Sequence, residues 1–140
     1  MCGRMTQTTD PAEVARIFDA ESALDEDAAE AAPRYNVAPT QPLTVVLQRA
    51  EEGRLVEQHR WGLVPSFSKS LKDGARRINA RAETVATSPS FRSSFRKRRC
   101  IVPSDGFYEW RRTGGPRQTY FLHPTEEAVL AMAGIWAVWK

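Results

Sequence analysis

The stretch LTVVLQRAEEGRLVEQHRW, residues 43–61, predicts a β-hairpin. Residues 43–48 are mostly apolar and β-branched, which is typical of a strand. The segment Glu51-Glu52-Gly53 supplies a turn, and residues 54–61 alternate between apolar and polar side chains as a half-buried strand does. A paired unit of this kind in the middle of the chain indicates a fold built around a β-sheet.

More strands are expected toward the C-terminus. Residues 100–103 and 106–110 predict two strands joined by an irregular corner. The last strand, about Val129 to Trp139, is apolar on both faces, as expected of a buried central strand. Its unpaired edge would invite aggregation, so either earlier strands close over it or the natural protein continues beyond Lys140. We favour the second, a fragment of a longer protein.

The helices are expected at the periphery. Asp10-Pro11-Ala12-Glu13 predicts a helix start, with a capping Asp, Pro at the first helical position and Glu three residues after the cap. The acidic stretch 21–32 is weakly patterned and is interpreted as a surface helix or a loop. The predicted class is therefore α+β, a β-rich core with a few peripheral helices.

Composition narrows the class of protein further. A chain of 140 residues and 15.8 kDa fits one domain with its own core. Two cysteines are too few for a disulfide framework, and this favours a reducing compartment. The sequence shows no signal peptide, and its longest apolar stretch is too short to span a bilayer. We expect a soluble cytoplasmic protein without a membrane partner.

Charge is distributed unevenly along the chain. Residues 69–99 hold ten basic side chains against two acidic ones, and seven of the ten are arginines. Such a segment favours a polyanion such as nucleic acid, because arginine binds phosphate in a bidentate manner and phosphate neutralisation releases counterions. The alternative is a solvated helix face without a partner.

Cys2 directly follows Met1, so removal of one residue would give an N-terminal cysteine. Such a residue carries a thiol and an α-amine on adjacent carbons. An aldehyde condenses with the amine to an imine, and the sulfur then closes a five-membered thiazolidine ring, which an internal cysteine cannot do. The alternative is a frayed, chemically idle terminus.

Two polar residues are candidate partners in such chemistry. Asn79 lies in a polar-rich segment, and its amide offers a donor and an acceptor for orienting an amine, a hydroxyl or a backbone group. Glu109 lies between aromatic residues in Phe107-Tyr108-Glu109-Trp110, which suits general acid/base work. Its alternative is an outward-facing residue on a half-exposed strand.

The remaining candidates carry less chemistry. His59 and His123 lie in strand-like contexts without a second metal ligand at useful spacing, so both are interpreted as structural or surface residues. Cys100 begins a strand and is expected to be a core thiol. No metal-site spacing, phosphate-cradling glycine loop or nucleophile elbow is present, so we expect no metal and no cofactor.

Five segments in this order resemble the SRAP family, the SOS-response-associated peptidase domains that are also called abasic site processing proteins. They are Met1-Cys2-Gly3-Arg4, residues 34–40 (RYNVAPT), residues 61–65 (WGLVP), residues 78–84 (INARAET) and residues 99–110 (RCIVPSDGFYEW). The resemblance covers the whole chain and implies one SRAP domain over residues 1–140, with a barrel-like core of mostly antiparallel strands. It also implies abasic single-stranded DNA as the partner of a chain that acts as a monomer.

The resemblance further implies roles for individual residues. Cys2 would be the nucleophile after loss of Met1, Asn79 would hold the reacting amine or the sugar, and Glu109 would move protons. Residues implied to contact or shape the DNA channel are Arg4, Asn36, Pro39, Trp61, Phe67 and Arg81. Arg4 and Arg81 would grip phosphates and Phe67 would stack on or wedge against a base, although the family often has Trp near this position.

The chain departs from the family in one place. The family's essential His lies in a His-x-Arg-Met-Pro segment, which this sequence lacks. The resemblance thus implies a C-terminally truncated domain with impaired activity. Two other functions stay open: a thiol peptidase with Cys2 as nucleophile, and a non-enzymatic module that binds single-stranded nucleic acid through residues 69–99.

Overall fold

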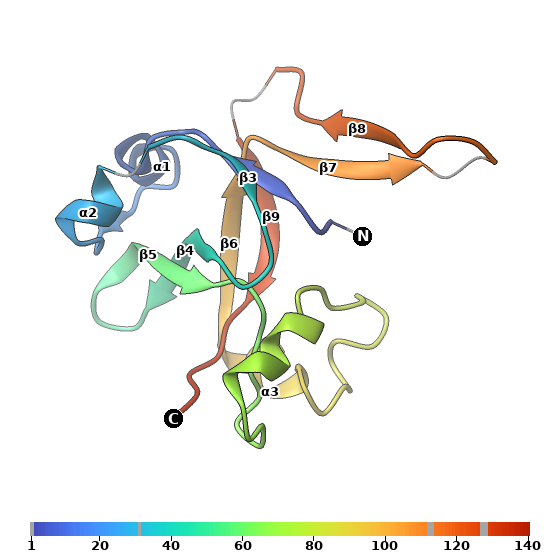
Figure 1. Ribbon diagram of the computed structural model, residues 1–140. Coiled ribbons are helices and arrows are strands. Elements are labelled where there is room, and N and C mark those ends of the chain that lie inside the picture. The colour runs from blue at the N-terminus through green and yellow to red at the C-terminus, as the bar shows by residue number, and fades with distance from the viewer. Residues whose placement is uncertain (1, 31, 112–113, 127–128) are drawn as a thin grey trace.

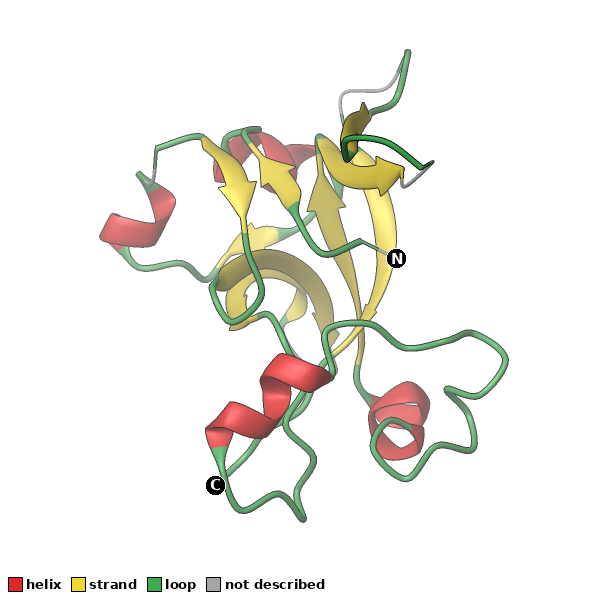
Figure 2. Cartoon of the chain, turned by 45° about the vertical axis from the view of Figure 1, so that its right-hand side comes forward, coloured by secondary structure: helices red, strands yellow, loops and turns green. Residues whose placement is uncertain are grey.

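The computed structural model describes residues 2–30, 32–111, 114–126 and 129–140. Its strands are β1 (Met5–Gln7), β2 (Glu21–Ser22), β3 (Arg34–Val37), β4 (Pro42–Arg49), β5 (Gly53–Arg60), β6 (Arg99–Ser104), β7 (Gly106–Arg111), β8 (Gln118–Leu122) and β9 (Leu130–Ile135). Its helices are α1 (Pro11–Ile17), α2 (Glu26–Ala29), α3 (Arg92–Lys97) and the 3₁₀ helix η1 (Leu71–Arg76). The helices lie outside the strands, so the predicted α+β class is confirmed (Figure 2).

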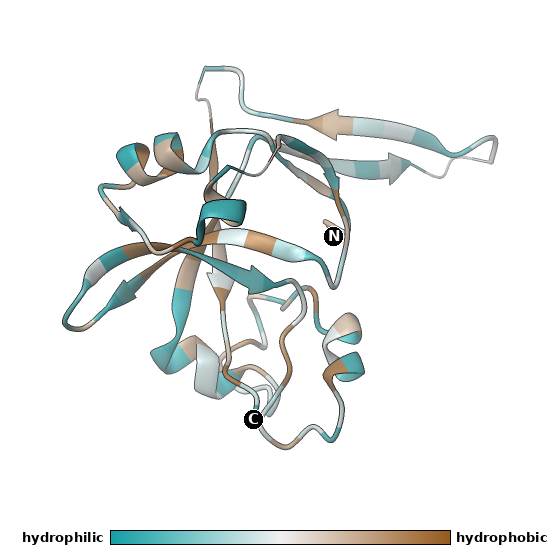
Figure 3. Cartoon of the chain, turned by 60° about the vertical axis from the view of Figure 1, so that its left-hand side comes forward, coloured by the Kyte–Doolittle hydropathy of each residue, from teal (hydrophilic) through white to brown (hydrophobic). Residues whose placement is uncertain are grey.

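The strands form two sheets and, among the described residues, no closed barrel. One sheet has four strands in the order β3-β1-β7-β8, and the other has five in the order β2-β5-β4-β6-β9. All the pairings are antiparallel except that of β2 with β5. The β7–β8 hairpin extends away from the five-stranded sheet, and the apolar end of β8 is exposed (Figures 1 and 3).

The predicted hairpin and first helix are confirmed. β4 pairs with β5 along its whole length, from Pro42 opposite Arg60 to Arg49 opposite Gly53. Gly53 has φ of 81°, a left-handed conformation that glycine adopts without steric cost. The side chain of Asp10 accepts a hydrogen bond from the Ala12 N–H at 2.7 Å and caps α1.

The prediction for the last strand is wrong in its position. β9 is shorter than the expected 129–139 strand and lies at the edge of the five-stranded sheet, where β6 is its one partner among the described strands. Ala131 and Ala133 are exposed on one face. Alanine in this run offers little apolar area, so an edge position costs little. Trp136 and Trp139 lie beyond the strand, and both line one cavity.

The described part of the acidic stretch 21–32, which leaves out residue 31, contains a short strand and a short helix. The two-residue strand β2 pairs with β5, and Asp25 caps the single-turn helix α2 through a 2.8 Å bond from the Ala28 N–H. No residue of α2 is buried. This stretch is therefore surface structure attached to the edge of the five-stranded sheet.

The five-stranded sheet packs on both faces. On one face, Val14 of α1 contacts Val46 and Val56, and Val56 is fully buried. On the other face, the side chains of β4 form a second core with the N-terminal segment and Trp61. The rings of His59 on β5 and Trp136 just after β9 lie 5.5 Å apart, although β4 and β6 separate those strands. This face must therefore be concave.

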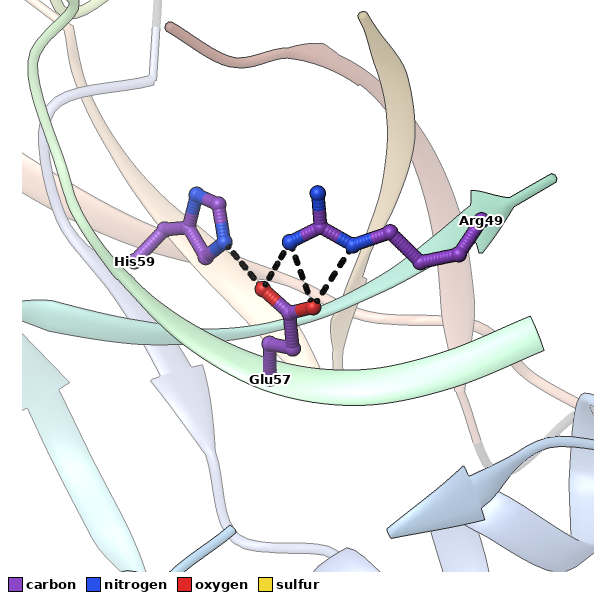
Figure 4. Close-up of polar contacts among 3 residues, drawn as sticks. All are labelled: Arg49, Glu57 and His59. Carbon is purple, nitrogen blue, oxygen red and sulfur yellow. Dashed lines mark hydrogen bonds and ion pairs between the residues drawn. The ribbon is translucent and has the colours of Figure 1, made fainter. Parts of the chain in front are cut away.

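A polar cluster lies beside this concave face. Arg49 donates to both carboxylate oxygens of Glu57, at 2.7 and 3.0 Å, and His59 bonds Glu57 at 2.8 Å (Figure 4). The guanidinium of Arg49 also stacks 4.8 Å from the centre of the Trp136 ring. Burial by itself would raise the pKa of the Glu57 carboxyl, but the bonds from His59 and Arg49 outweigh it and hold that pKa below its usual value.

Glu57 gives the first prediction, a pH-dependent contribution to stability. A carboxyl whose pKa is lowered by folding stabilises the protein above its unfolded pKa of about 4.3, and this contribution is lost as the pH falls through the lower, folded value. Glu57→Gln should be less stable than the wild type by about 1–2 kcal/mol near pH 6. The difference should shrink as the pH approaches about 3. Urea unfolding of both proteins at the two pH values measures it, and a difference that does not change with pH would contradict this account.

Candidate functional site

A cavity of about 640 Å³ lies on the concave face of the five-stranded sheet. Segments far apart in the sequence line it: the N-terminal segment, β4 to β6, the connection that follows β5, and the chain after β9. Its lining includes Cys2, Trp61, Asn79, Cys100, Trp136 and Trp139. The fold thus places the predicted nucleophile, Cys2, in an apolar cavity that is also lined by Cys100 and several aromatic side chains.

Cys2 is held in place rather than frayed. The side-chain amide of Asn79 donates to the Cys2 carbonyl oxygen at 2.7 Å, across 77 positions of sequence. The half-buried Cys2 thiol lies 3.5 Å from the Arg4 carbonyl oxygen, to which it donates. The resemblance implies that Asn79 holds the reacting amine or the sugar; in the structure its amide instead contacts the Cys2 carbonyl and fixes the backbone from which both reactive groups of residue 2 project.

The electrostatics of Cys2 link it to Glu109. Burial raises the pKa of the Cys2 thiol, the bond to the Arg4 carbonyl opposes this rise, and the negative charge of Glu109 adds to it. Glu109 reaches this place because β7 pairs with β1 and the Tyr108 N–H bonds the Arg4 carbonyl at 2.9 Å. At neutral pH the thiol is held protonated, with a carboxylate close enough to influence it.

Arg4 and Asn36 are joined by a side-chain hydrogen bond near Cys2. Arg4 donates to the Asn36 side-chain oxygen at 2.8 Å, and Asn36 lies exposed on β3. The next residue back, Tyr35, is 68% exposed and accepts a hydrogen bond at its carbonyl from the Tyr108 hydroxyl at 3.1 Å. The structure brings Arg4 and Asn36 together beside Cys2, and it adds Tyr35, an exposed aromatic within the 34–40 motif that the sequence reasoning did not select.

Trp61 lies in the core and also lines the cavity. It is 6% exposed, and its indole N–H donates to the Ile78 carbonyl at 2.9 Å, one residue before Asn79. Its backbone also bonds residues 40 and 41, next to the half-buried Pro39. The structure therefore gives Trp61 the position of a support that holds the segments carrying Pro39 and Asn79.

The other two predicted DNA contacts are exposed. Phe67 is 61% exposed in a turn closed by a 2.9 Å bond from the Ser68 N–H to the Pro65 carbonyl. Arg81 is also exposed, and its carbonyl accepts bonds from the N–H groups of Thr84 and Val85. Both side chains can reach a ligand outside the cavity, but no described contact joins either of them to Cys2.

Two glycines fix the connection that carries Phe67. Gly62 has φ of 122°, and a Cβ built there would lie 2.5 Å from the Gly74 carbonyl oxygen. The Leu63 N–H bonds the Arg77 carbonyl at 3.1 Å next to this contact. Only glycine allows the two backbones to approach this closely, so the pair sets where the chain emerges toward Asn79.

The second thiol is less accessible to chemistry than Cys2. Burial raises the pKa of the Cys100 thiol to about 11.

In the part of the chain that the structure describes, no group of three or more His, Cys, Asp or Glu side chains could hold a metal ion. Within the same residues no helix is long and apolar enough to cross a membrane.

The fold and the site together define a class: α+β proteins in which an N-terminal cysteine segment and an asparagine line one cavity, and the charge of a glutamate acts on the cysteine. The family model of the SOS response associated peptidase (SRAP) matches residues 1–140. The chain therefore belongs to the SRAP family, which confirms the resemblance of the five sequence motifs.

Individual relatives agree with this assignment. The chain is 37% identical over 141 residues to the abasic site processing protein YoqW of Bacillus subtilis, covering all of this chain and 62% of that protein. It is 32% identical over 137 residues to the abasic site processing protein YedK of Escherichia coli, covering 96% of this chain and 59% of the relative. A solved protein of Bacteroides thetaiotaomicron, 29% identical, superposes with a TM-score of 0.82 over 96% of this chain and 61% of its own. The chain spans about three fifths of the length of these relatives.

Proposed function

We propose that this chain processes abasic sites in single-stranded DNA and captures the lesion covalently on Cys2. The observation that carries the proposal is the 2.7 Å hydrogen bond by which Asn79 holds the Cys2 backbone inside the cavity. The names of the relatives supply the substrate class, since YoqW and YedK are both called abasic site processing proteins.

The proposed chemistry uses both reactive groups of residue 2 once Met1 is removed. The α-amine attacks the open-chain aldehyde of the abasic sugar, and the aldehyde oxygen leaves as water to give an imine. The sulfur then attacks the imine carbon while the thiol proton moves to the nitrogen. The ring closes to a thiazolidine with loss of one water and no change in oxidation state.

Glu109 is the proton carrier in this scheme. Dehydration of the first adduct needs a proton donor, and ring closure needs an acceptor for the thiol proton. A carboxylate whose charge acts on Cys2 can serve both steps in turn. Asn79 is a positioning residue, because its amide contacts the Cys2 carbonyl and not the reacting atoms.

The DNA strand would be held outside the cavity by residues at its rim. Arg4, half-buried beside Asn36, and the exposed Arg81 are the proposed phosphate contacts. The exposed Phe67 is the proposed base contact. Trp61 and Pro39 would shape the channel, with Trp61 bonded to the backbone of Ile78 and of residues 40 and 41, next to Pro39.

The proposal is tested by the intact mass of the protein after incubation with a single-stranded oligonucleotide that contains one abasic site. The expected product is the Met1-free chain plus the oligonucleotide minus one water, stable to denaturation and mapped to Cys2. The endpoint after long incubation is the relevant quantity, because slow formation is compatible with the chemistry. Absence of the adduct on protein shown to lack Met1 would refute the proposal.

Peptide turnover distinguishes the alternative, a thiol peptidase with Cys2 as nucleophile. Cleavage of peptides other than the protein's own N-terminus, without adduct formation on abasic DNA, would favour the peptidase. Binding that is salt-dependent but indifferent to both the lesion and Cys2 would leave only a nucleic-acid-binding module.

A further inference from the structure

Trp139 lies next to the turn that carries Phe67. Its indole N–H donates to the Ser68 carbonyl at 2.9 Å, across 71 positions of sequence. Phe67 is 61% exposed and Trp139 is 37% exposed. Two large aromatic side chains from distant parts of the chain are therefore presented to solvent around one residue, Ser68.

The surroundings of this pair are basic. Lys69, Lys72 and Arg76 are exposed in the segment that follows Phe67. Between residues 66 and 80 the sole acidic residue is Asp73. Exposed aromatic rings interleaved with cationic side chains match single-stranded nucleic acid, whose bases stack and whose phosphates carry the negative charge.

Trp139 connects the pair to the site at Cys2. Trp139 and Leu71 line the same cavity as Cys2 and Asn79. Trp139 is also partly exposed, so it stands at the edge of that cavity. A strand whose base rests on this aromatic pair would lead directly toward the reactive residue.

We propose that Trp139 and Phe67 form a base-stacking platform for single-stranded nucleic acid at the edge of the Cys2 cavity. This inference rests on the proposed function, which supplies the class of ligand, and it adds Trp139 as a residue that binds an intact base beside the lesion. The hydrogen bond to Ser68 engages the edge of the indole, so stacking on the face of the ring does not compete with it. The platform reads no sequence, because every base has a face to stack.

The test measures the affinity of variants for undamaged single-stranded DNA by fluorescence anisotropy. Trp139→Ala should weaken binding about fivefold to a hundredfold, the effect of losing one base-stacking contact. Trp139→Phe should retain most of the affinity, because a phenyl ring also stacks although it lacks the N–H. Val138→Ala is the matched control: Val138 is exposed and adjacent but not aromatic, and its truncation should leave the affinity unchanged.

A second ligand separates stacking from phosphate contact. An oligomer of tetrahydrofuran abasic analogues has the phosphates of DNA but no bases, and it cannot form an imine. On this oligomer wild type and Trp139→Ala should bind equally, and the salt dependence of binding to normal DNA should have the same slope for both proteins. An equal loss of affinity on the base-free oligomer would overturn the proposal, as would unchanged binding of Trp139→Ala to normal DNA.

The outcomes distinguish this inference from the proposed function. Neither ligand contains an aldehyde, so the platform is tested without any adduct at Cys2. Circular dichroism shows whether Trp139→Ala stays folded. If it does not, Trp139→Phe provides the test. A folded Trp139→Phe whose affinity falls to that of Phe67→Ala would contradict a stacking role. A platform without adduct formation would refute the proposed function alone.

Discussion

Replacing Cys2 by alanine should abolish the stable adduct with abasic single-stranded DNA, whereas replacing Cys100 by alanine should preserve it. Both cysteines line the same cavity, but only Cys2 can carry an α-amine beside its thiol. After removal of Met1, Cys2→Ala retains the amine and loses the sulfur. It can form an imine, which water reverses, but it cannot close the ring.

Denaturing gels and intact mass measure the result, with borohydride as the diagnostic reagent. Borohydride reduction should trap the imine of Cys2→Ala as a stable amine, and without reduction no adduct should survive denaturation. Cys100→Ala should give the wild-type product, since burial that raises the pKa of the Cys100 thiol to about 11 keeps this group out of the reaction. A stable adduct on unreduced Cys2→Ala, or its loss in a folded Cys100→Ala, would contradict the assignment of the nucleophile.

Gly62→Ala should lower the free energy of unfolding by more than about 3 kcal/mol, enough to unfold the protein or nearly so. Backbone strain combined with a steric clash reaches this range. The new Cβ would lie 2.5 Å from the Gly74 carbonyl oxygen and 2.8 Å from its carbon, neither of which is a flexible side-chain end. In addition, a φ of 122° is a conformation that residues with a Cβ rarely adopt.

Gly53→Ala is the matched control for this substitution. Gly53 also has positive φ, at 81°, but nothing lies within 4 Å of a Cβ built there. Its cost should be about 1–2 kcal/mol, from the left-handed conformation alone. Thermal unfolding of both variants measures the difference, and equal losses of stability would mean that the Gly62–Gly74 contact contributes nothing.

The hairpin and the first helix could be predicted because their signals are local. The alternation in residues 54–61 and the Asp10-Pro11 cap need no information from distant residues. The position of the last strand could not be predicted in this way, because an apolar run does not say which strands lie beside it. β9 pairs with β6, and this pairing depends on the order of strands in the whole sheet.

In the candidate site, too, the residue types could be predicted from the sequence and the contacts between distant residues could not. The residue types at Cys2, Asn79 and Glu109 suggested chemistry, but the bond from Asn79 to the Cys2 carbonyl depends on a contact across 77 positions. The motif around Trp61 predicts a residue that shapes the channel, but its indole bond to the Ile78 carbonyl cannot be predicted from the motif. Trp139 was hidden in the apolar run 129–139, and only its bond to Ser68 reveals an exposed aromatic beside Phe67.

While Met1 is attached, burial raises the pKa of the Cys2 thiol, and this has a consequence for selectivity. Oxidants and alkylating electrophiles react with thiolates, so a thiol kept in its protonated form is spared by most of the reactive compounds in a cell. A carbonyl compound that first condenses with the neighbouring amine presents its carbon to the sulfur within one molecule, where proximity replaces intrinsic reactivity. Burial thus makes the Cys2 thiol of the Met1-bearing chain a poor general nucleophile, and the amine released by loss of Met1 would direct it to aldehydes.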